Sequence, residues 1–268
     1  MNMQNFCGID IGCTNIKMLA SVNRIVIKKT VPSGDNLSRD ELINIIENFC
    51  NSYKINFDGI GIAFSGCTKD NKKVYSTPLN CLQDLSVDDF SNFSKNVFLI
   101  NDSNAATLAG MLQYPRTKVL VGITNGTGIG LGVAIDGKLF TGANGLLGEI
   151  YGNPVLLDNG HNVKKIGQII SGSKILNEIT ETNNTEIIHE AAKYLGTLLV
   201  QVIHFYNPNV IYFSGGGFSF NGFLNEAIIF AKQRAYPSFL ECLSFKQSAY
   251  GSYTGCVGAI KLVKEKIG

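Results

Sequence analysis

The amino-acid sequence predicts an α/β protein built from two similar halves. Each half opens with short, closely spaced strands, at residues 5–30 in the first and 118–140 in the second, which is typical of an antiparallel meander. Helical and strand patterns follow both meanders in a similar order. The repeated order predicts a duplicated architecture of two lobes, with the ligand site in the cleft between them.

The first half combines the meander with two later strands and two helices. Ser38 precedes an apolar stripe of helical spacing and is the predicted cap of the first helix. The polar segment 68–95 is expected to consist of turns. The predicted strands are 5–9, 15–22, 25–30, 59–64 and 97–101, and the predicted helices are 39–53 and 103–113.

The second half begins after Tyr114-Pro115. Asp136-Gly137 is a two-residue hairpin signal between two of its strands. The predicted strands are 118–124, 130–135, 139–140, 210–213 and 243–247, and the predicted helices are 173–178, 186–205, 222–234 and 255–266. We expect residues 1–113 plus 252–268 to form the first lobe and residues 114–251 to form the second.

Composition excludes several classes of protein. The chain has 268 residues, of which 45% are hydrophobic, and a net charge of +2 that is scattered rather than clustered, so no nucleic-acid partner is expected. No uncharged run approaches the ~18 residues of a membrane helix, so no membrane partner is expected either. The seven cysteines lack a C-x-x-C pair, which indicates reduced thiols and a cytoplasmic protein.

A strand-to-helix turn at Asn101-Asp102 is the first candidate site. Ligands of open α/β sheets bind at the carboxyl ends of strands, and two polar side chains there could receive a substrate hydroxyl. Asp102 would act as the base and Asn101 would orient the group. The alternative is that Asp102 or Ser103 only caps the following helix.

Two glycine-containing turns occupy the same place in the two meanders. Asp10-x-Gly12-x-Thr14 and Gly126-Thr127-Gly128 would face each other across the cleft and hold nucleotide phosphates with amides and hydroxyls. Asp10 is suited to bind Mg²⁺, directly or through water. The alternative is that these glycines only relieve strain in tight hairpins. Neither turn matches the P-loop or the dinucleotide fingerprint.

Five ordered motifs resemble those of the ROK family, which comprises bacterial sugar kinases and related repressors of the hexokinase and actin superfamily. They are Gly8-Ile-Asp-Ile-Gly-Cys-Thr14, Asn101-Asp-Ser-Asn-Ala-Ala106, Gly126-Thr-Gly-Ile-Gly130, Gly142-Ala-Asn-Gly-Leu-Leu-Gly-Glu149 and Ile211-Tyr-Phe-Ser-Gly-Gly-Gly217. The resemblance implies a duplicated actin-like (ribonuclease H-like) ATPase fold, with ATP and a sugar in the cleft. It also implies a homodimer.

The resemblance further implies an ATP-dependent kinase that phosphorylates a sugar hydroxyl, usually the one on C6 of a hexose. Asp102 would be the general base. The implied sugar-binding residues are Asn101, Glu149, Gly66 and Asn80. The implied ATP-binding residues are Asp10, Gly12, Thr14, Lys17, Gly126, Thr127, Gly128, Gly215, Gly216 and Gly217, with Mg²⁺ at Asp10.

The chain departs from the family pattern where relatives bind zinc. Those relatives show E-x-G-H and then C-x-C-G-x-x-G-C-x-E, whereas this chain has Glu149-Ile-Tyr-Gly152 and later Gly167 in place of the second glutamate. No zinc site is therefore expected, and His161 is expected to be solvated. In relatives the missing histidine and glutamate hold the C1 and C2 hydroxyls. The glycines would leave room for a substituent there, as in an amino or acylamino hexose such as N-acetylmannosamine, or in a glycoside.

Two other functions stay open within the same family. Regulators carry a DNA-binding segment before the first phosphate strand, and only about five residues precede that strand here, so we expect a kinase rather than a regulator. A non-catalytic sugar-binding protein would explain the missing histidine and glutamate, although Thr14, Asp102 and Thr127 are present.

Overall fold

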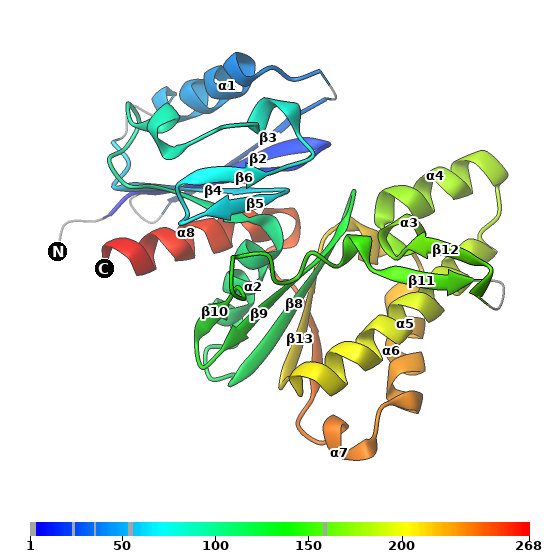
Figure 1. The fold of residues 1–268 in the computed structure, drawn as a ribbon. Coiled ribbons are helices and arrows are strands. Elements are labelled where there is room, and N and C mark those ends of the chain that lie inside the picture. Colours follow the sequence, from blue (N-terminus) through cyan, green and yellow to red (C-terminus); the bar gives the residue numbers. More distant parts are fainter. Residues whose placement is uncertain (1–3, 23–24, 35, 53–55, 158–159) are drawn as a thin grey trace.

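Two five-stranded sheets with the same strand order form the framework of the protein (Figure 1). The structure is a computed structural model that describes residues 4–22, 25–34, 36–52, 56–157 and 160–268. The first sheet has the order β3-β2-β1-β4-β7 and the second has the order β10-β9-β8-β13-β14. In each sheet the first three strands are antiparallel and the last two run parallel to the first. The predicted duplicated α/β architecture is therefore confirmed.

The main strands and helices agree with the predicted elements to within a few residues. The sheets contain β1 (Phe6–Ile11), β2 (Asn15–Val22), β3 (Ile25–Pro32), β4 (Gly59–Phe64), β7 (Val97–Asn101), β8 (Val119–Asn125), β9 (Ile129–Ile135), β10 (Lys138–Phe140), β13 (Val210–Ser214) and β14 (Ser244–Gln247). The predicted long helices are α1 (Arg39–Asn51), α2 (Asp102–Gln113), α4 (Gly172–Thr182), α5 (Glu186–Tyr206), α6 (Phe223–Arg234) and α8 (Thr254–Ile267). Ser38 caps α1 as predicted, because its hydroxyl accepts a hydrogen bond from the Glu41 amide. The predicted end of α1 at Tyr53 lies outside the described residues.

Several short elements were not predicted. The segment expected to be turns contains β5 (Cys67–Lys69), β6 (Lys73–Ser76) and the 3₁₀ helices η1 (Asn80–Leu82) and η2 (Val87–Phe90). A hairpin of β11 (Pro154–Leu157) and β12 (Asn162–Lys165) and the short helices α3 (Gly167–Ile170) and α7 (Pro237–Leu240) were also missed. These elements have three or four residues each, too few for a hydrophobic period to develop.

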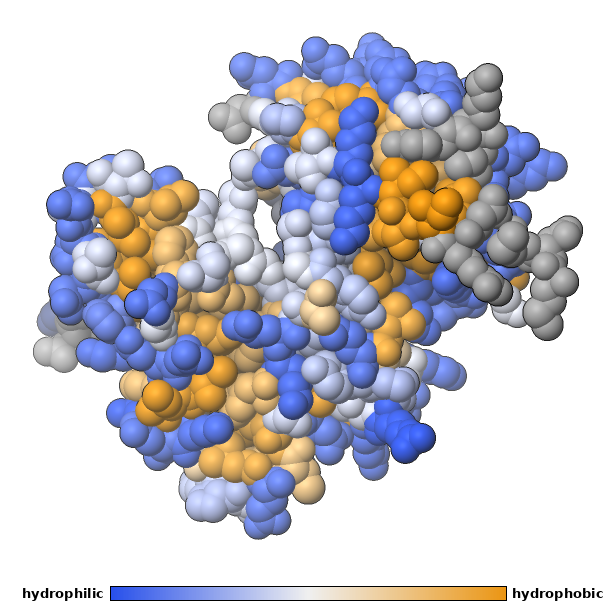
Figure 2. Space-filling model, turned by 180° about the vertical axis from the view of Figure 1, so that it is seen from behind, coloured by the Kyte–Doolittle hydropathy of each residue, from blue (hydrophilic) through white to orange (hydrophobic). Residues whose placement is uncertain are grey.

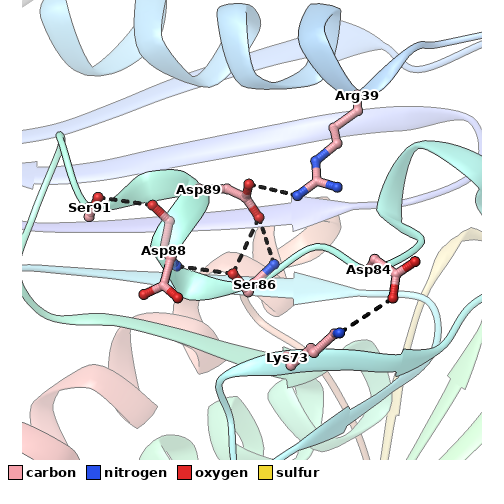
Figure 3. Close-up of polar contacts among 7 residues, drawn as sticks. All are labelled: Arg39, Lys73, Asp84, Ser86, Asp88, Asp89 and Ser91. Atoms are coloured by element: carbon pink, nitrogen blue, oxygen red, sulfur yellow. Dashed lines mark hydrogen bonds and ion pairs between the residues drawn. The ribbon is translucent and has the colours of Figure 1, made fainter.

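A polar network fixes the segment between β6 and β7 against the first lobe (Figure 3). Arg39 at the start of α1 forms an ion pair of 2.6 Å with Asp89 in η2. Asp89 also accepts a hydrogen bond of 2.7 Å from the Ser86 amide, which closes a capping box on η2. The network thereby holds the segment that carries Asn80.

Among the described residues the hydrophobic core has one part in each lobe, a third part between the sheets and a smaller fourth part between α8 and the first sheet. The helices α2 and α8 pack against each other, and Figure 1 shows both beside the first sheet on the side opposite α1. The central cluster combines Ile100 of β7, Leu108 of α2, Ala259 of α8 and Tyr212 of β13. The Ser103 and Thr124 hydroxyls, 2.6 Å apart, add a polar link between α2 and β8. The helix that begins at Asp102 is therefore fixed to both lobes.

Two other expectations from the sequence concern thiols and membranes. The seven cysteines, all of them among the described residues, form no disulfide with one another. Among the described residues, no helix has both the length and the apolar character that crossing a membrane requires. We keep the lobe boundaries, residues 1–113 with 252–268 and residues 114–251, as a prediction.

Candidate functional site

Asn101 caps α2 and leaves the carboxylate of Asp102 available. The Asn101 Oδ1 atom accepts hydrogen bonds from the amides of Ser103 at 2.9 Å and Asn104 at 3.0 Å. The alternative that Asp102 or Ser103 caps the helix is therefore wrong, since the cap lies one residue earlier. Asp102 Oδ1 accepts from the Ser103 amide at 2.7 Å, and Oδ2 accepts no hydrogen bond from any described residue. One carboxylate oxygen is thus free for a substrate hydroxyl.

The surroundings of Asp102 favour its protonated form. Burial is the main cause that raises the pKa of its carboxyl to about 7, and the nearby negative charges of Asp10 and Glu149 raise it further. The hydrogen bonds from Ser103 act in the opposite direction. A carboxylate with a pKa near neutrality is suited to accept a proton at physiological pH.

Glu149 lies beside Asn101 because the preceding loop approaches β9 closely. Gly148 has φ +98°, and a Cβ there would lie well under 3.0 Å from the Leu131 carbonyl oxygen, so only glycine fits. The Glu149 Oε1 atom then accepts from Asn101 Nδ2 at 3.4 Å and from Cys67 Sγ at 3.3 Å. The structure thus brings Glu149 and Asn101 together, as the resemblance implied.

Gly66 and Cys67 complete this side of the site. The Gly66 carbonyl accepts a hydrogen bond of 2.9 Å from Asn101 Nδ2. Burial, followed by the charges of Glu149 and Asp102, raises the pKa of the Cys67 thiol to about 12, so the thiol stays a donor to Glu149. Cys67 was missed from the sequence, although its place directly after Gly66 could have indicated it.

The two predicted phosphate turns face each other. The hydroxyl oxygens of Thr14 and Thr127 lie 3.5 Å apart although they are 113 residues apart in the chain. Ser173 at the start of α4 supports the second turn, because its hydroxyl donates to the Thr127 carbonyl at 2.7 Å. In Figure 2, which shows the molecule from behind, the surface is hollowed between the lobes, and the neighbouring residues are pale, of intermediate hydropathy.

Asp10 lies beneath the first turn with Lys17 beside it. Their charged groups are 3.7 Å apart, and the Asp10 carboxyl packs against Gly255 in the first turn of α8. Burial raises the pKa of Asp10, and Lys17 opposes that shift. Mg²⁺ commonly takes one or two carboxylates and completes its shell with phosphate oxygens and water, so this site with a single carboxylate fits it. No group of three or more His, Cys, Asp or Glu side chains placed to hold a metal occurs in the described part of the chain, and His161 is exposed.

Asn125 is a buried polar residue that the sequence did not identify as part of the site. Its Nδ2 donates to the Ile170 carbonyl at 2.9 Å, and its Oδ1 accepts from the Gly172 amide at 2.8 Å. Gly215 and Gly217 both pack directly on Asn125. Asn125 therefore joins the second phosphate turn, which begins at Gly126, to the Gly215–Gly217 turn predicted to lie near the adenosine.

Asn80 lies beside the first phosphate turn. It is exposed, and with Gly12 and Cys13 it lines a cavity of about 190 Å³. The printed contact of its side chain is with Gln83, at 3.5 Å. The predicted sugar-binding residues thus form two groups: Asn101, Glu149 and Gly66 are in contact, and Asn80 lies beside the first turn.

The expectation that Gly152 and Gly167 both leave open space is half wrong. A Cβ at Gly152 would have no other heavy atom within 4 Å, so that position is open. A Cβ at Gly167 would lie well under 3.0 Å from the ring of Tyr151, which occupies that space. The sequence shows the two glycines, but it does not show that the ring of Tyr151 points toward Gly167.

Comparisons with known proteins identify the family and the fold of this chain. A sequence model of the ROK family matches residues 6–164 and 160–266. The chain is 22% identical over 296 residues to the xylose repressor of Bacillus spizizenii, and the match covers 96% of this chain and 76% of that protein. It is 25% identical over 317 residues to the glucokinase of Halalkalibacterium halodurans, and the match covers 97% of this chain and 95% of that protein. Its fold matches that of a glucokinase from Streptomyces griseus in complex with glucose and AMPPNP, with a TM-score of 0.80, 18% identity, and 97% and 99% of the two chains covered.

Proposed function

Because this chain belongs to the ROK family and has its duplicated two-lobe fold, we propose that it is an ATP-dependent sugar kinase. The observation that carries the proposal is the setting of Asp102. Asp102 directly follows Asn101, which contacts Glu149, and the facing turns of Thr14 and Thr127 supply groups that suit nucleotide phosphates. A base between a hydroxyl-binding group and a phosphate-binding group is what phosphoryl transfer to an alcohol requires.

In the proposed mechanism Asp102 accepts the proton of the sugar hydroxyl as that oxygen attacks the γ-phosphorus. The bond between this phosphorus and the β–γ bridging oxygen breaks, and ADP leaves. Asn101 and Glu149 hold other hydroxyls, so that the attacking oxygen is aligned. The amides and hydroxyls of the two phosphate turns bind the nucleotide, with Asn125 as a positioning residue. When bound at Asp10, Mg²⁺ supplies neutralisation of phosphate charge. Because the pKa of Asp102 is close to the working pH, a substantial fraction of its carboxyl groups is ionised and ready to accept a proton.

The proposed substrate is a hexose, phosphorylated on its C6 hydroxyl. Open space at Gly152 supports an amino or acylamino hexose such as N-acetylmannosamine, or a glycoside, beside plain glucose. From the family resemblance we also propose a cytoplasmic homodimer, with the lobe boundaries stated above.

A substrate panel tests the proposal. Purified protein with ATP and Mg²⁺ is expected to release ADP in the presence of at least one of glucose, mannose, N-acetylglucosamine, N-acetylmannosamine and methyl glucoside, with phosphorus NMR locating the new ester. ADP release that does not depend on sugar would instead indicate an ATPase. No turnover with any of the five sugars would contradict the kinase proposal.

A sugar-binding regulator is the second candidate, and the similarity to a xylose repressor favours it. The absence of side chains at Gly152 and Gly167 would also suit a site that binds sugar without reaction. Calorimetry separates the two candidates, since a regulator would bind xylose or another sugar without ADP release.

The rate of phosphoryl transfer should depend on pH through Asp102. Because its pKa is about 7 and the base must be ionised, kcat is expected to fall about tenfold per unit below that pH. The measurement is kcat at saturating sugar and ATP between about pH 5.5 and about pH 8.5. A flat profile across this range would contradict the assignment of Asp102 as the base.

A further inference from the structure

The ring of Tyr151 packs between Gly128 of the second phosphate turn and Gly167, where it forms an aromatic wall. Tyr151 belongs to η3 (Ile150–Gly152), two residues after Glu149. Its ring fills the space that a side chain at Gly167 would need, and its Cδ2 atom lies 3.7 Å from where a Cβ of Gly128 would be. The ring therefore lies between the second phosphate turn and the start of α3.

The packing of this ring depends on glycine at its neighbours. Any larger residue at position 167 would collide with the ring, so tyrosine at 151 and glycine at 167 fit only together. Tyr151 is nevertheless 40% exposed, and the lack of a side chain at Gly128 leaves its ring uncovered on that side. A fixed aromatic surface is thus left open to a ligand.

The chemistry of the Tyr151 wall differs from that of the polar groups around Asp102. Asn101, Asp102 and Glu149 offer an amide and two carboxylates, which suit hydroxyl groups. The Tyr151 wall is made of the ring and of the two glycines packed beside it, at 128 and 167. A hydroxyl directed at a ring face loses water without gaining a good partner, whereas an alkyl or acyl group gains contact with the ring.

We infer that Tyr151 is a specificity-determining residue that packs against an apolar substituent of the sugar. The inference rests on the proposed function, because it concerns the acceptor of that same site. The preferred acceptor is then a hexose with an N-acyl, O-alkyl or O-aryl group rather than the parent sugar with bare hydroxyls.

Matched pairs of sugars test this inference. The pairs are glucose with phenyl glucoside, and glucose and mannose with their 2-acetamido derivatives. The wild-type chain is expected to show a kcat/KM for the substituted member of at least one pair that is about tenfold higher than for its parent. Tyr151→Ala should lower this preference to about one, mainly by raising KM, and Tyr151→Phe should keep it, since the ring face and not the hydroxyl makes the contact.

A second variant and a control make the result specific. Gly167→Ala should displace the ring and reduce the preference as Tyr151→Ala does. Tyr236→Ala, at a tyrosine that is 68% exposed and stacks on His204, should change nothing. A preference that persists in Tyr151→Ala, or a wild-type preference for the parent sugars, would overturn the inference.

Calorimetry without ATP separates this inference from the proposed function. If no sugar is phosphorylated but the substituted sugar binds more tightly in a manner that depends on Tyr151, the kinase proposal fails and the inference stands. If a sugar is phosphorylated with a preference that ignores Tyr151, the inference fails alone. If no sugar of the pairs reacts or binds, both fail.

Discussion

Replacing Asp102 with asparagine should lower kcat for sugar phosphorylation by about 10³-fold or more, while KM for the sugar changes little. Asparagine keeps the size and the hydrogen bond to the Ser103 amide but cannot take a proton. The measurement is ADP release with the best sugar of the panel. Retention of more than about a tenth of the wild-type kcat would show that Asp102 is not the base.

The same substitution is expected to stabilise the folded chain at alkaline pH. Because folding raises the pKa of Asp102 from 3.8 to about 7, the folded state binds the proton more tightly, and stability is lost as the pH rises between these values. Asp102→Asn removes that loss. The free energy of unfolding should rise by about 1–2 kcal/mol at pH 8 and by less at pH 5. This gain is smaller than the whole pKa shift would give, because the side chain reaches the cleft.

Thermal unfolding at the two pH values measures this effect. Asp136→Asn, at an exposed hairpin residue with φ 49°, is the matched control and should alter neither stability nor turnover. A variant that is inactive but less stable than the wild type at pH 8 would indicate that Asp102 supports the structure instead of the chemistry.

Gly258→Ala is expected to lower the free energy of unfolding by about 3 kcal/mol or more. A Cβ at this position of α8 would lie well under 3.0 Å from the Ala105 carbonyl, which belongs to the backbone of α2 and cannot rotate away. On the other side of α8, Gly8 and Gly61 allow similarly close contact with the carbonyls of Cys256 and Ala259. An added methyl group must therefore separate α8 from α2 or from the sheet.

Thermal unfolding should show a decrease of about 6 °C or more for Gly258→Ala. The kcat of any remaining folded protein should fall too, because α2 carries Asp102 and the sheet carries Asp10. Gly216→Ala is the control for stability, since a Cβ there has no other heavy atom within 4 Å. An unchanged unfolding temperature for Gly258→Ala would show that the helices can move apart at little cost.

That Thr14 and Thr127 face each other could be predicted, because it depends on the strand topology of the two sheets. Both turns connect the first two strands of a sheet, and the two sheets repeat the same order. The choice of Asn101 as the helix cap could not be predicted, because Asn, Asp and Ser all supply a suitable oxygen and only the backbone angle at 101 decides between them.

The packing of side chains that are far apart in the sequence was the other feature that could not be predicted. Tyr151 occupies the space at Gly167, sixteen positions along the chain, and neither residue type indicates the direction of the ring. Asn125 resembles an ordinary turn residue in the sequence, and its burial follows from the approach of Gly172 and Gly217. Duplication and motifs therefore predicted the framework and the main groups of the site, and close packing determined the rest.

The packing of α8 on β1 and β4 has a consequence for the order in which the protein is made. A ribosome completes the whole first sheet and all of the second lobe before it reaches residues 254–267, which cover Phe6 and Leu19. Until then the nascent chain exposes that apolar face of its earliest strands. This face of the first sheet can be covered only after both sheets have emerged, so chaperones would find a binding surface on β1 and β2.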